Sequence, residues 1–175
     1  MFGDKAVFNQ ICGMKYCACL PTPLGTIQIA ATAAGICSIK FTDDTAGPDT
    51  AEQPDCLWLC KSQITDYFNG QLRHFTLPLQ LEGTGFQLAV WKYLQEIDYG
   101  RTTTYGNIAK KLFTPKAARA VGAACGANPL WLVVPCHRVV GGTGSLTGYG
   151  GGLPRKRWLL DFEQTQLKGK QTSLF

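Results

Sequence analysis

The chain has 175 residues, a net charge of +5 at pH 7, 45% hydrophobic residues and 17% charged residues. This length fits one domain of ordinary size or two small ones, and the composition excludes a disordered chain. No apolar run approaches the roughly 18 residues of a membrane span, and residues 1–15 lack the apolar core of a signal peptide. We therefore expect a protein that resides inside the cell and does not associate with a membrane.

Eight cysteines are spread along the chain, at Cys12, Cys17, Cys19, Cys37, Cys56, Cys60, Cys125 and Cys136. Thiols inside a cell stay reduced, so we expect no disulfide framework. No CxxC pair signals zinc, although Cys17 and Cys19 would share one face of a strand, where Cys12 or Cys37 could join them. Buried apolar cysteines are the alternative, and we predict neither a metal nor an organic cofactor.

The first half of the chain has the pattern of a small β-meander followed by a helix. Apolar residues predict strands at 15–20, 26–31 and 36–41, and a helical stripe covers 56–68. Residues 75–81 predict another short strand, which Pro78 would confine to a sheet edge. His74 lies in a polar connection, and we interpret it as a surface histidine. No residue of this half points to chemistry.

A polar segment with two glycines at 82–85 marks the predicted boundary between domains 1–83 and 84–175. Beyond it the pattern becomes helical, with helices expected at 86–97, 105–112 and 116–125. Thr104 is the expected N-cap of the second helix, and Thr114-Pro115 is the start signal of the third. The sequence thus predicts an α+β protein, with a small β-sheet and a helix in the first domain and a mostly helical second domain.

The helices at 105–112 and 116–125 form a helix-turn-helix pattern. The second is built largely from alanine and glycine around Arg119. Such a helix suits close approach to a narrow DNA groove with little base reading, while packing against another helix is the alternative. Residues 110–157 hold eight cations and no acidic residue, which favours binding of a polyanion over a merely basic surface.

Thiol chemistry is predicted around Cys136 and His137. The apolar run 132–134 predicts a strand that delivers the pair, and seven glycines at 141–152 predict a loop that wraps a ligand. A thiol reacts as thiolate, which an adjacent histidine can generate when a third group orients it. Glu163, at the edge of the apolar stripe of the last helix, is the candidate for that group. Contact within the pair would require a turn or a bridging water, because adjacent strand residues point to opposite faces.

The segment Pro135-Cys136-His137-Arg138-Val139-Val140 resembles the signature of the O6-alkylguanine-DNA alkyltransferases, or methylated-DNA–protein-cysteine methyltransferases. The resemblance continues in order over nearly the whole chain. It includes Thr22-Pro23-Leu24-Gly25, Leu77-Pro78-Leu79, Gly83-Thr84-Gly85-Phe86-Gln87, Val90-Trp91, Tyr105-Gly106, residues 115–122, Asn128-Pro129, Gly148-Tyr149, Gly151-Gly152-Leu153 and Trp158-Leu159-Leu160. It implies a ribonuclease H-like topology for the N-terminal domain.

The resemblance implies direct-reversal DNA repair, in which the alkyl group of O6-alkylguanine moves once to Cys136; O4-alkylthymine is a further candidate substrate. His137, oriented by Glu163, would promote thiolate formation through water. Asn128 would be the hinge beside the cysteine, and Tyr105 would help to rotate the base and protonate guanine N3. The implied partner is double-stranded DNA that carries the lesion, bound through its minor groove by a monomer, cytoplasmic in a prokaryote or nuclear in a eukaryote.

The same resemblance implies that Arg119 fills the gap left by the flipped base. DNA contacts are implied for Tyr105, Gly106, Thr114, Lys116, Ala118 and Gly142, and the pocket is expected to include Trp131, Pro135, Val139, Tyr149 and Gly150. Two positions depart from the family: Gly150 replaces a small polar residue, and Trp131 replaces a smaller residue or proline. We hypothesise that Trp131 forms one wall of the pocket and so favours substrates with small alkyl groups. A surface or packing role for Trp131 is the alternative. The turn Phe113-Thr114 also departs from the glycine-asparagine common there.

Three other functions are open on sequence grounds. A Cys-His hydrolase would need an oxyanion hole and would leave the helix-turn-helix unexplained. A DNA-binding module could recognise flipped bases without chemistry, as relatives without the cysteine do, although Cys136 argues against it. A transcriptional regulator is disfavoured because the second helix has almost no base-reading side chains.

Overall fold

The computed structural model describes residues 16–43, 49–50 and 53–171. The chain divides into two compact units, residues 1–81 and 82–175. No helix in the described ranges is both long and apolar enough to cross a bilayer.

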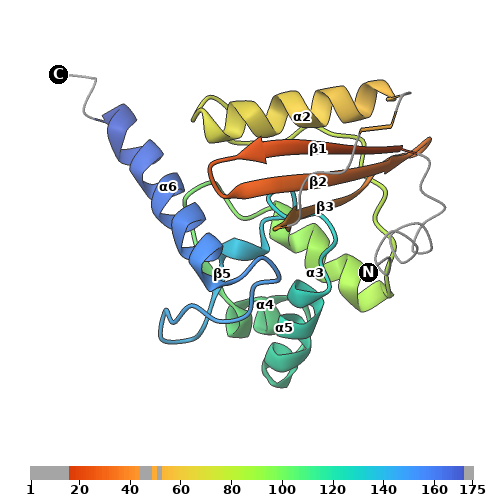
Figure 1. Cartoon of the computed structure of the whole chain (residues 1–175). Helices are drawn as coiled ribbons and strands as arrows, with labels where there is room; N and C mark the ends of the chain where they lie inside the picture. The colour runs from red at the N-terminus through yellow and green to blue at the C-terminus, as the bar shows by residue number, and fades with distance from the viewer. Residues whose placement is uncertain (1–15, 44–48, 51–52, 172–175) are drawn as a thin grey trace. The chain divides into compact units, whose positions relative to one another are not determined.

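The first unit is a three-stranded antiparallel sheet with a helix along it (Figure 1). Its strands are β1 (Tyr16–Thr22), β2 (Gly25–Thr32) and β3 (Gly35–Thr42), in that order across the sheet, and its helix is α2 (Asp55–Phe68). The predicted meander and helix are confirmed, with ends that differ by one or two residues. The core gathers apolar side chains of both layers: Ala18, Ile27, Ile29, Ile36, Ile39, Leu57, Cys60, Ile64 and Tyr67.

The predicted strand at 75–81 is wrong in extent, because a single bridge pairs this segment with β3. Ile36 donates its N–H to the carbonyl of Pro78 at 2.8 Å, and Gln80 donates to the carbonyl of Ile36 at 2.8 Å. Pro78 has no N–H with which to extend the ladder, so the pairing ends there. His74, in the preceding connection, is exposed as predicted.

The second unit is mostly helical, as predicted. It contains α3 (Gly85–Gln95), α4 (Tyr105–Leu112), α5 (Ala118–Gly126) and α6 (Leu153–Gln171), with the two-residue strands β4 (Thr103–Thr104) and β5 (Val139–Val140). Thr104 caps α4 by accepting the N–H of Asn107 at 3.1 Å, which confirms the predicted N-cap. A 3-10 turn, Pro115–Ala117, precedes α5, so the α-helix begins two residues later than expected.

Two contacts hold the helix-turn-helix against the rest of this unit. The helices α4 and α5 lie side by side (Figure 1), and Trp91 of α3 donates its indole N–H to the carbonyl of Ala124 in α5 at 2.8 Å. Strand β4, just before α4, pairs in parallel with β5, which follows Cys136. The start of α4 is thereby fixed beside the cysteine segment.

Candidate active site

The segment before Cys136 is a turn, and the predicted strand at 132–134 is wrong. Leu132 adopts a positive φ of 72°, and the N–H of Val134 donates to the carbonyl of Leu130 at 2.9 Å. The buried amide of Asn128 closes the turn: its Nδ2 donates to the carbonyl of Val134 at 2.7 Å, and its Oδ1 accepts the N–H of Leu130 at 3.0 Å. These local bonds override the strand preference of the apolar run.

Cys136 opens a short 3-10 helix, Cys136–Arg138, and its side chain is buried. The Nδ2 of Asn128 lies 3.2 Å from Sγ and donates a hydrogen bond to it. Burial raises the pKa of the Cys136 thiol, while the Asn128 hydrogen bond and the charge of Lys156 act to lower it. The site therefore stabilises a thiolate through two polar groups, but deprotonation requires a base.

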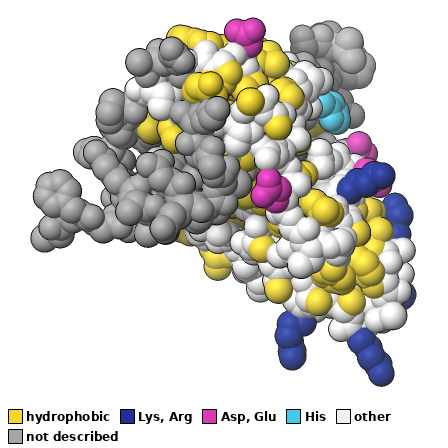
Figure 2. Space-filling view, turned by 90° about the vertical axis from the view of Figure 1, so that its right-hand side faces the viewer, with side chains coloured by type: hydrophobic (Ala, Val, Ile, Leu, Met, Phe, Trp, Pro, Cys, Tyr) yellow, Lys and Arg dark blue, Asp and Glu magenta, His cyan; other side chains and the backbone are white. Residues whose placement is uncertain are grey.

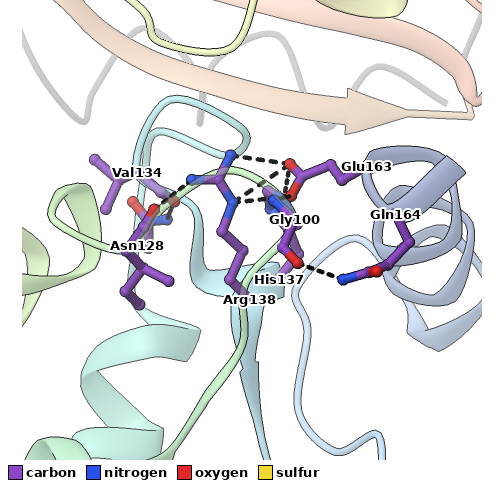
Figure 3. Close-up of polar contacts among 8 residues, drawn as sticks. Gly100, Asn128, Val134, His137, Arg138, Glu163 and Gln164 are labelled. Carbon is purple, nitrogen blue, oxygen red and sulfur yellow. Dashed lines mark hydrogen bonds and ion pairs between the residues drawn. The ribbon is translucent and has the colours of Figure 1, made fainter. Parts of the chain in front are cut away.

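His137 is fully buried, and its Nε2 lies 2.9 Å from Oε1 of Glu163 (Figure 3). Burial lowers the pKa of His137, although Glu163 opposes the shift, so the imidazole is neutral. A neutral ring that faces a carboxylate carries its proton on Nε2, which leaves a lone pair on Nδ1. Nδ1 is buried, and no residue in the described part of the chain hydrogen bonds to it. The histidine is thus oriented as a base.

Glu163 is fully buried and interacts with His137, Arg138 and Gly100, as Figure 3 shows. Besides His137, it accepts from Nη2 of Arg138 at 2.9 Å and from the N–H of Gly100 at 2.8 Å. Burial alone would raise the pKa of this carboxyl, but His137 and Arg138 hold it well below its usual value. The predicted contact between the last helix and the histidine is confirmed.

The predicted basic face is wrong at two positions, since Arg138 and Lys156 are buried. Arg138 pairs with Glu163, and Lys156 donates to backbone carbonyls around the site. The other cations of the window are exposed or, for Arg155, half-buried: Lys110, Lys111, Lys116, Arg119, Arg155 and Arg157. On the face seen in Figure 2, Lys and Arg side chains gather in the lower and right-hand part, around apolar side chains.

Sequence reasoning missed the roles of Arg138 and Lys156 because it counted them as surface charge. A signal was present for the lysine: Lys156, Leu159 and Glu163 follow one another at helical spacing and form one buried stripe of α6. For Arg138 the sequence holds no comparable signal. Two aromatic side chains of α6, Trp158 and Phe162, are only half-buried, and their rings stack with centroids 4.9 Å apart.

Tyr149 and Trp131 form an aromatic pair next to His137. The ring of Tyr149 lies 6.5 Å from the imidazole and 5.7 Å from the ring of Trp131. The indole N–H of Trp131 donates to the carbonyl of Asn128 at 3.0 Å. The hydroxyl oxygen of Tyr149 is buried, and none of the residues that the structure describes hydrogen bonds to it. Two buried polar atoms, this oxygen and Nδ1 of His137, are therefore available to a ligand or to water.

Tyr105, at the start of α4, donates its hydroxyl to the carbonyl of Thr147 at 3.0 Å, within the glycine-rich loop. Burial raises the pKa of this hydroxyl. Gly122 of α5 lies beneath the tyrosine ring, where an added Cβ would be 3.8 Å from it. The small residues of α5 thus serve packing against Tyr105 at Gly122, while Ala120 and Ala123 are exposed.

The structure brings Asn128, Cys136, His137 and Glu163 into one connected cluster. Of the remaining predicted residues, Pro135 and Val139 are buried beside the cysteine, and Gly150 is exposed next to Trp131. Of the predicted DNA-contact residues, Tyr105 and Ala118 are half-buried, and the others lie exposed on the helix-turn-helix and the loop: Gly106, Thr114, Lys116, Arg119 and Gly142.

The cysteines form no metal site in the described residues, where no three candidate ligands lie together. Cys17, Cys19 and Cys37 form no disulfide among the described residues, and Cys12 lies outside them.

The fold and site define a helix-turn-helix protein with a buried, hydrogen-bonded thiol beside an oriented histidine. Residues 85–165 match the family model of the 6-O-methylguanine DNA methyltransferase DNA-binding domain, and residues 15–81 match the ribonuclease-like domain of the same proteins. The chain belongs to the 6-O-methylguanine DNA methyltransferase family.

Individual relatives agree with this assignment. The methylated-DNA–protein-cysteine methyltransferase of Mycobacterium tuberculosis is 41% identical to this chain, over 84% of this chain and 91% of the relative. The enzyme of the same name from Methanosarcina acetivorans is 43% identical, over 85% of this chain and 97% of the relative. The crystal structure of the M. tuberculosis OGT in complex with DNA superposes with a TM-score of 0.76 at 41% identity, and covers 85% of this chain and 92% of the other.

Proposed function

We infer that this protein repairs alkylated DNA by transferring the alkyl group from O6 of guanine to Cys136. The observation that carries the inference is the buried thiol, which accepts a hydrogen bond from Asn128 and adjoins the His137–Glu163 pair. The methyltransferase names of the relatives and the DNA complex of one of them support the same reaction. Each molecule acts once, because no step of the reaction returns the thioether to a thiol.

His137 is the base that generates the thiolate. Its Nδ1 carries the free lone pair and takes the Cys136 proton through a bridging water, while Glu163 stabilises the imidazolium that forms. Asn128 holds the sulfur by donating to it at 3.2 Å. The thiolate then attacks the alkyl carbon, a carbon–sulfur bond forms and the carbon–oxygen bond breaks.

Tyr105 supplies the proton that the departing guanine needs. The electron pair of the broken bond spreads over the purine ring, and protonation at N3 neutralises it. The Tyr105 hydroxyl donates to a loop carbonyl in the free protein and would redirect that proton to N3 once the base is bound. Trp131, Tyr149 and the backbone at Gly150 line the base pocket.

The target base reaches this buried thiol by leaving the DNA stack. We assign the exposed small residues of α5, Ala120 and Ala123, to close approach in the minor groove, with Arg119 inserted in the gap left by the base. Thr114, Lys116, Gly106, Ala118 and Gly142 are assigned to the DNA backbone on either side. The protein acts as a monomer where the DNA is, in the cytoplasm of a prokaryote or the nucleus of a eukaryote.

Intact mass after exposure to duplex DNA with one O6-methylguanine tests the proposal. We expect a gain of one methyl group per molecule, mapped to Cys136, with equimolar repaired guanine; Cys136→Ser should gain nothing. Turnover beyond one equivalent would instead support a hydrolase. No mass gain in a protein whose Cys136 is shown to be reduced would overturn the proposal, and tight binding without transfer would indicate a recognition module.

A further inference from the structure

Cys125 is a second buried thiol beside the proposed nucleophile, and the mechanism above gives it no role. It lies in the last turn of α5 and is 4% exposed, compared with 3% for Cys136. The sequence of the second unit, residues 82–175, holds two cysteines, and these are Cys125 and Cys136. A reaction at Cys136 therefore has one other thiol of the same unit to involve.

Contacts made by Asn128 bring the two cysteines close to each other. The backbone N–H of Asn128 donates to the carbonyl of Cys125 at 3.3 Å, and its side-chain Nδ2 lies 3.2 Å from Sγ of Cys136. Asn128 is itself buried. The end of α5 and the first residue of the short 3-10 helix thus meet at a single side chain in the interior of the unit.

The two cysteine side chains also share their polar neighbours. Gly122 precedes Cys125 by three residues and so lies on the same side of α5, where an added Cβ would be 3.8 Å from the ring of Tyr105. Negative charge on either sulfur interacts with Tyr105 and with Lys156, and the two sulfurs interact with each other. Both thiols therefore border one space.

The two thiols differ in how readily they ionise. Burial raises the pKa of Cys125 to about 12, and the charge of Cys136 adds to the shift, so the Cys125 thiol stays protonated. The Cys136 sulfur accepts the Asn128 hydrogen bond and has His137 as its proposed base, so it is the sulfur that becomes a thiolate. Peroxides oxidise thiolates and not thiols. Oxidation of this pair therefore begins at Cys136.

We propose that Cys125 is the resolving thiol of Cys136, with which it forms a reversible disulfide when hydrogen peroxide attacks the site. The Cys136 thiolate takes one oxygen of the peroxide and becomes a sulfenic acid, and the hydroxide that leaves is protonated to water. The Cys125 sulfur then attacks the sulfenic sulfur. The sulfur–sulfur bond forms, the sulfur–oxygen bond breaks, and the departing hydroxide takes the Cys125 proton and leaves as a second water.

The disulfide keeps the sulfur of Cys136 in a form that a dithiol restores, whereas further oxidation to sulfinic acid is not reversed by dithiols. Alkyl transfer stops while the disulfide exists, because Cys136 has no thiolate. This consequence for repair rests on the proposed function, but the disulfide itself does not. The end of α5 has room to adjust to the new bond, since a Cβ added at Gly126 would meet nothing within 4 Å.

A limited dose of hydrogen peroxide, followed by peptide mapping without reductant, tests the proposal. The unmodified protein should give a cross-linked pair of peptides, one with Cys125 and one with Cys136, and dithiothreitol should restore both thiols together with methyl transfer from O6-methylguanine DNA. Cys125→Ala should instead accumulate sulfinic acid at Cys136 and should not regain transfer with dithiothreitol. Cys56→Ser, at a half-buried cysteine of the first unit, is the control and should form the same cross-link as the unmodified protein.

Cys125→Ser, which keeps the size of the side chain, serves if the alanine variant does not fold. Sulfinic acid that forms at Cys136 equally fast with and without Cys125 would overturn the proposal, and so would a disulfide between Cys136 and a cysteine of the first unit. Absence of methyl transfer by the reduced, unmodified protein would refute the proposed function, and the peptide map would still decide whether the disulfide forms.

Discussion

The indole ring of Trp131 fills the space that a side chain at position 150 would need. A Cβ placed on Gly150 would lie 2.5 Å from Cζ2 of that ring and 3.1 Å from Cε2. The ring cannot retreat freely, because its N–H donates to the carbonyl of Asn128. Trp131 and Gly150 are therefore a single steric feature, in which the large residue requires the small one.

Gly150→Ala should lower stability by about 1–3 kcal/mol, since the added methyl group overpacks against the tryptophan ring. Gly150→Ala should cost less stability in a Trp131→Ala background than in the unmodified protein, because Trp131→Ala removes the ring with which the added methyl group clashes. Chemical denaturation of the single and double variants measures the coupling. Gly169→Ala, where an added Cβ meets nothing within 4 Å, is the control and should not lose stability. If the losses of stability in the two single variants simply add in the double variant, the two residues do not interact sterically.

Trp131→Ala should raise the rate of benzyl transfer relative to methyl transfer, because a ring that lies beside Tyr149 is removed from the predicted pocket. Single-turnover rates with O6-methylguanine and O6-benzylguanine DNA give the ratio. Trp58→Ala, on the exposed face of α2, should leave the ratio unchanged. If the ratio is the same in the Trp131 variant, the residue packs without selecting substrates.

Asn128→Ala should slow the labelling of Cys136 by iodoacetamide at neutral pH, because the hydrogen bond that favours the thiolate is lost. It should also destabilise the fold by roughly 1–3 kcal/mol, since the carbonyl of Val134 loses one of its donors and the N–H of Leu130 loses its acceptor. Asn107→Ala, at an exposed site on α4, is the matched control for stability. Unaltered labelling would show that Asn128 supports the turn and not the sulfur.

Glu163→Gln should be strongly destabilising, by about 3–5 kcal/mol, because Arg138 is left as an uncompensated buried charge. Transfer should fall as well, since the imidazolium loses its counter-charge. Asp161→Asn, an exposed acid two residues away on α6, should change neither quantity. Combining Glu163→Gln with Arg138→Met should recover part of the stability, and a purely additive loss would argue against the pairing.

Stability should fall as the pH is lowered from neutral. The pKa of His137 is below its unfolded value of roughly 6.5, so below that pH the unfolded chain binds a proton that the folded protein rejects. The pKa of Glu163 is also depressed, so its contribution is complete above roughly pH 4.3 and is lost as the pH falls further. Denaturant titrations between about pH 8 and pH 4 measure this slope, and His137→Gln should flatten its upper part. A slope unchanged in that variant would contradict a neutral buried histidine.

The helices and strands of this chain could be predicted from its sequence more accurately than its turns. The meander and the capped helix α4 followed from periodicity and capping residues, which are local signals. Periodicity placed Glu163 only at the edge of an apolar stripe, as a candidate partner of His137, and the structure shows the contact. The strand predicted at 132–134 is wrong because the apolar side chains of this run favour a strand, whereas its backbone forms a turn. The bonds of Asn128 that bend it run from a side chain to nearby backbone groups, and hydrophobic periodicity does not reveal them.

The sequence also predicted the burial of charged residues poorly. Arg138 and Lys156 were interpreted as surface cations of the basic window, yet each is buried where carboxylate or carbonyl oxygens converge. A sequence gives the number of charges directly, but burial depends on which elements meet around them. Only the helical spacing of Lys156 with Leu159 and Glu163 carried that information in advance.

The partners of Glu163 and of Lys156 divide the site into two halves, each held by a different side chain of α6. Glu163 attaches the histidine to α6, to the N–H of Gly100 and, through Arg138, to the carbonyl of Ile97, all outside the glycine-rich loop. The loop has its own anchor in Lys156. A substitution in the loop that leaves the Lys156 contacts intact should therefore leave the proton acceptor and its partners in place.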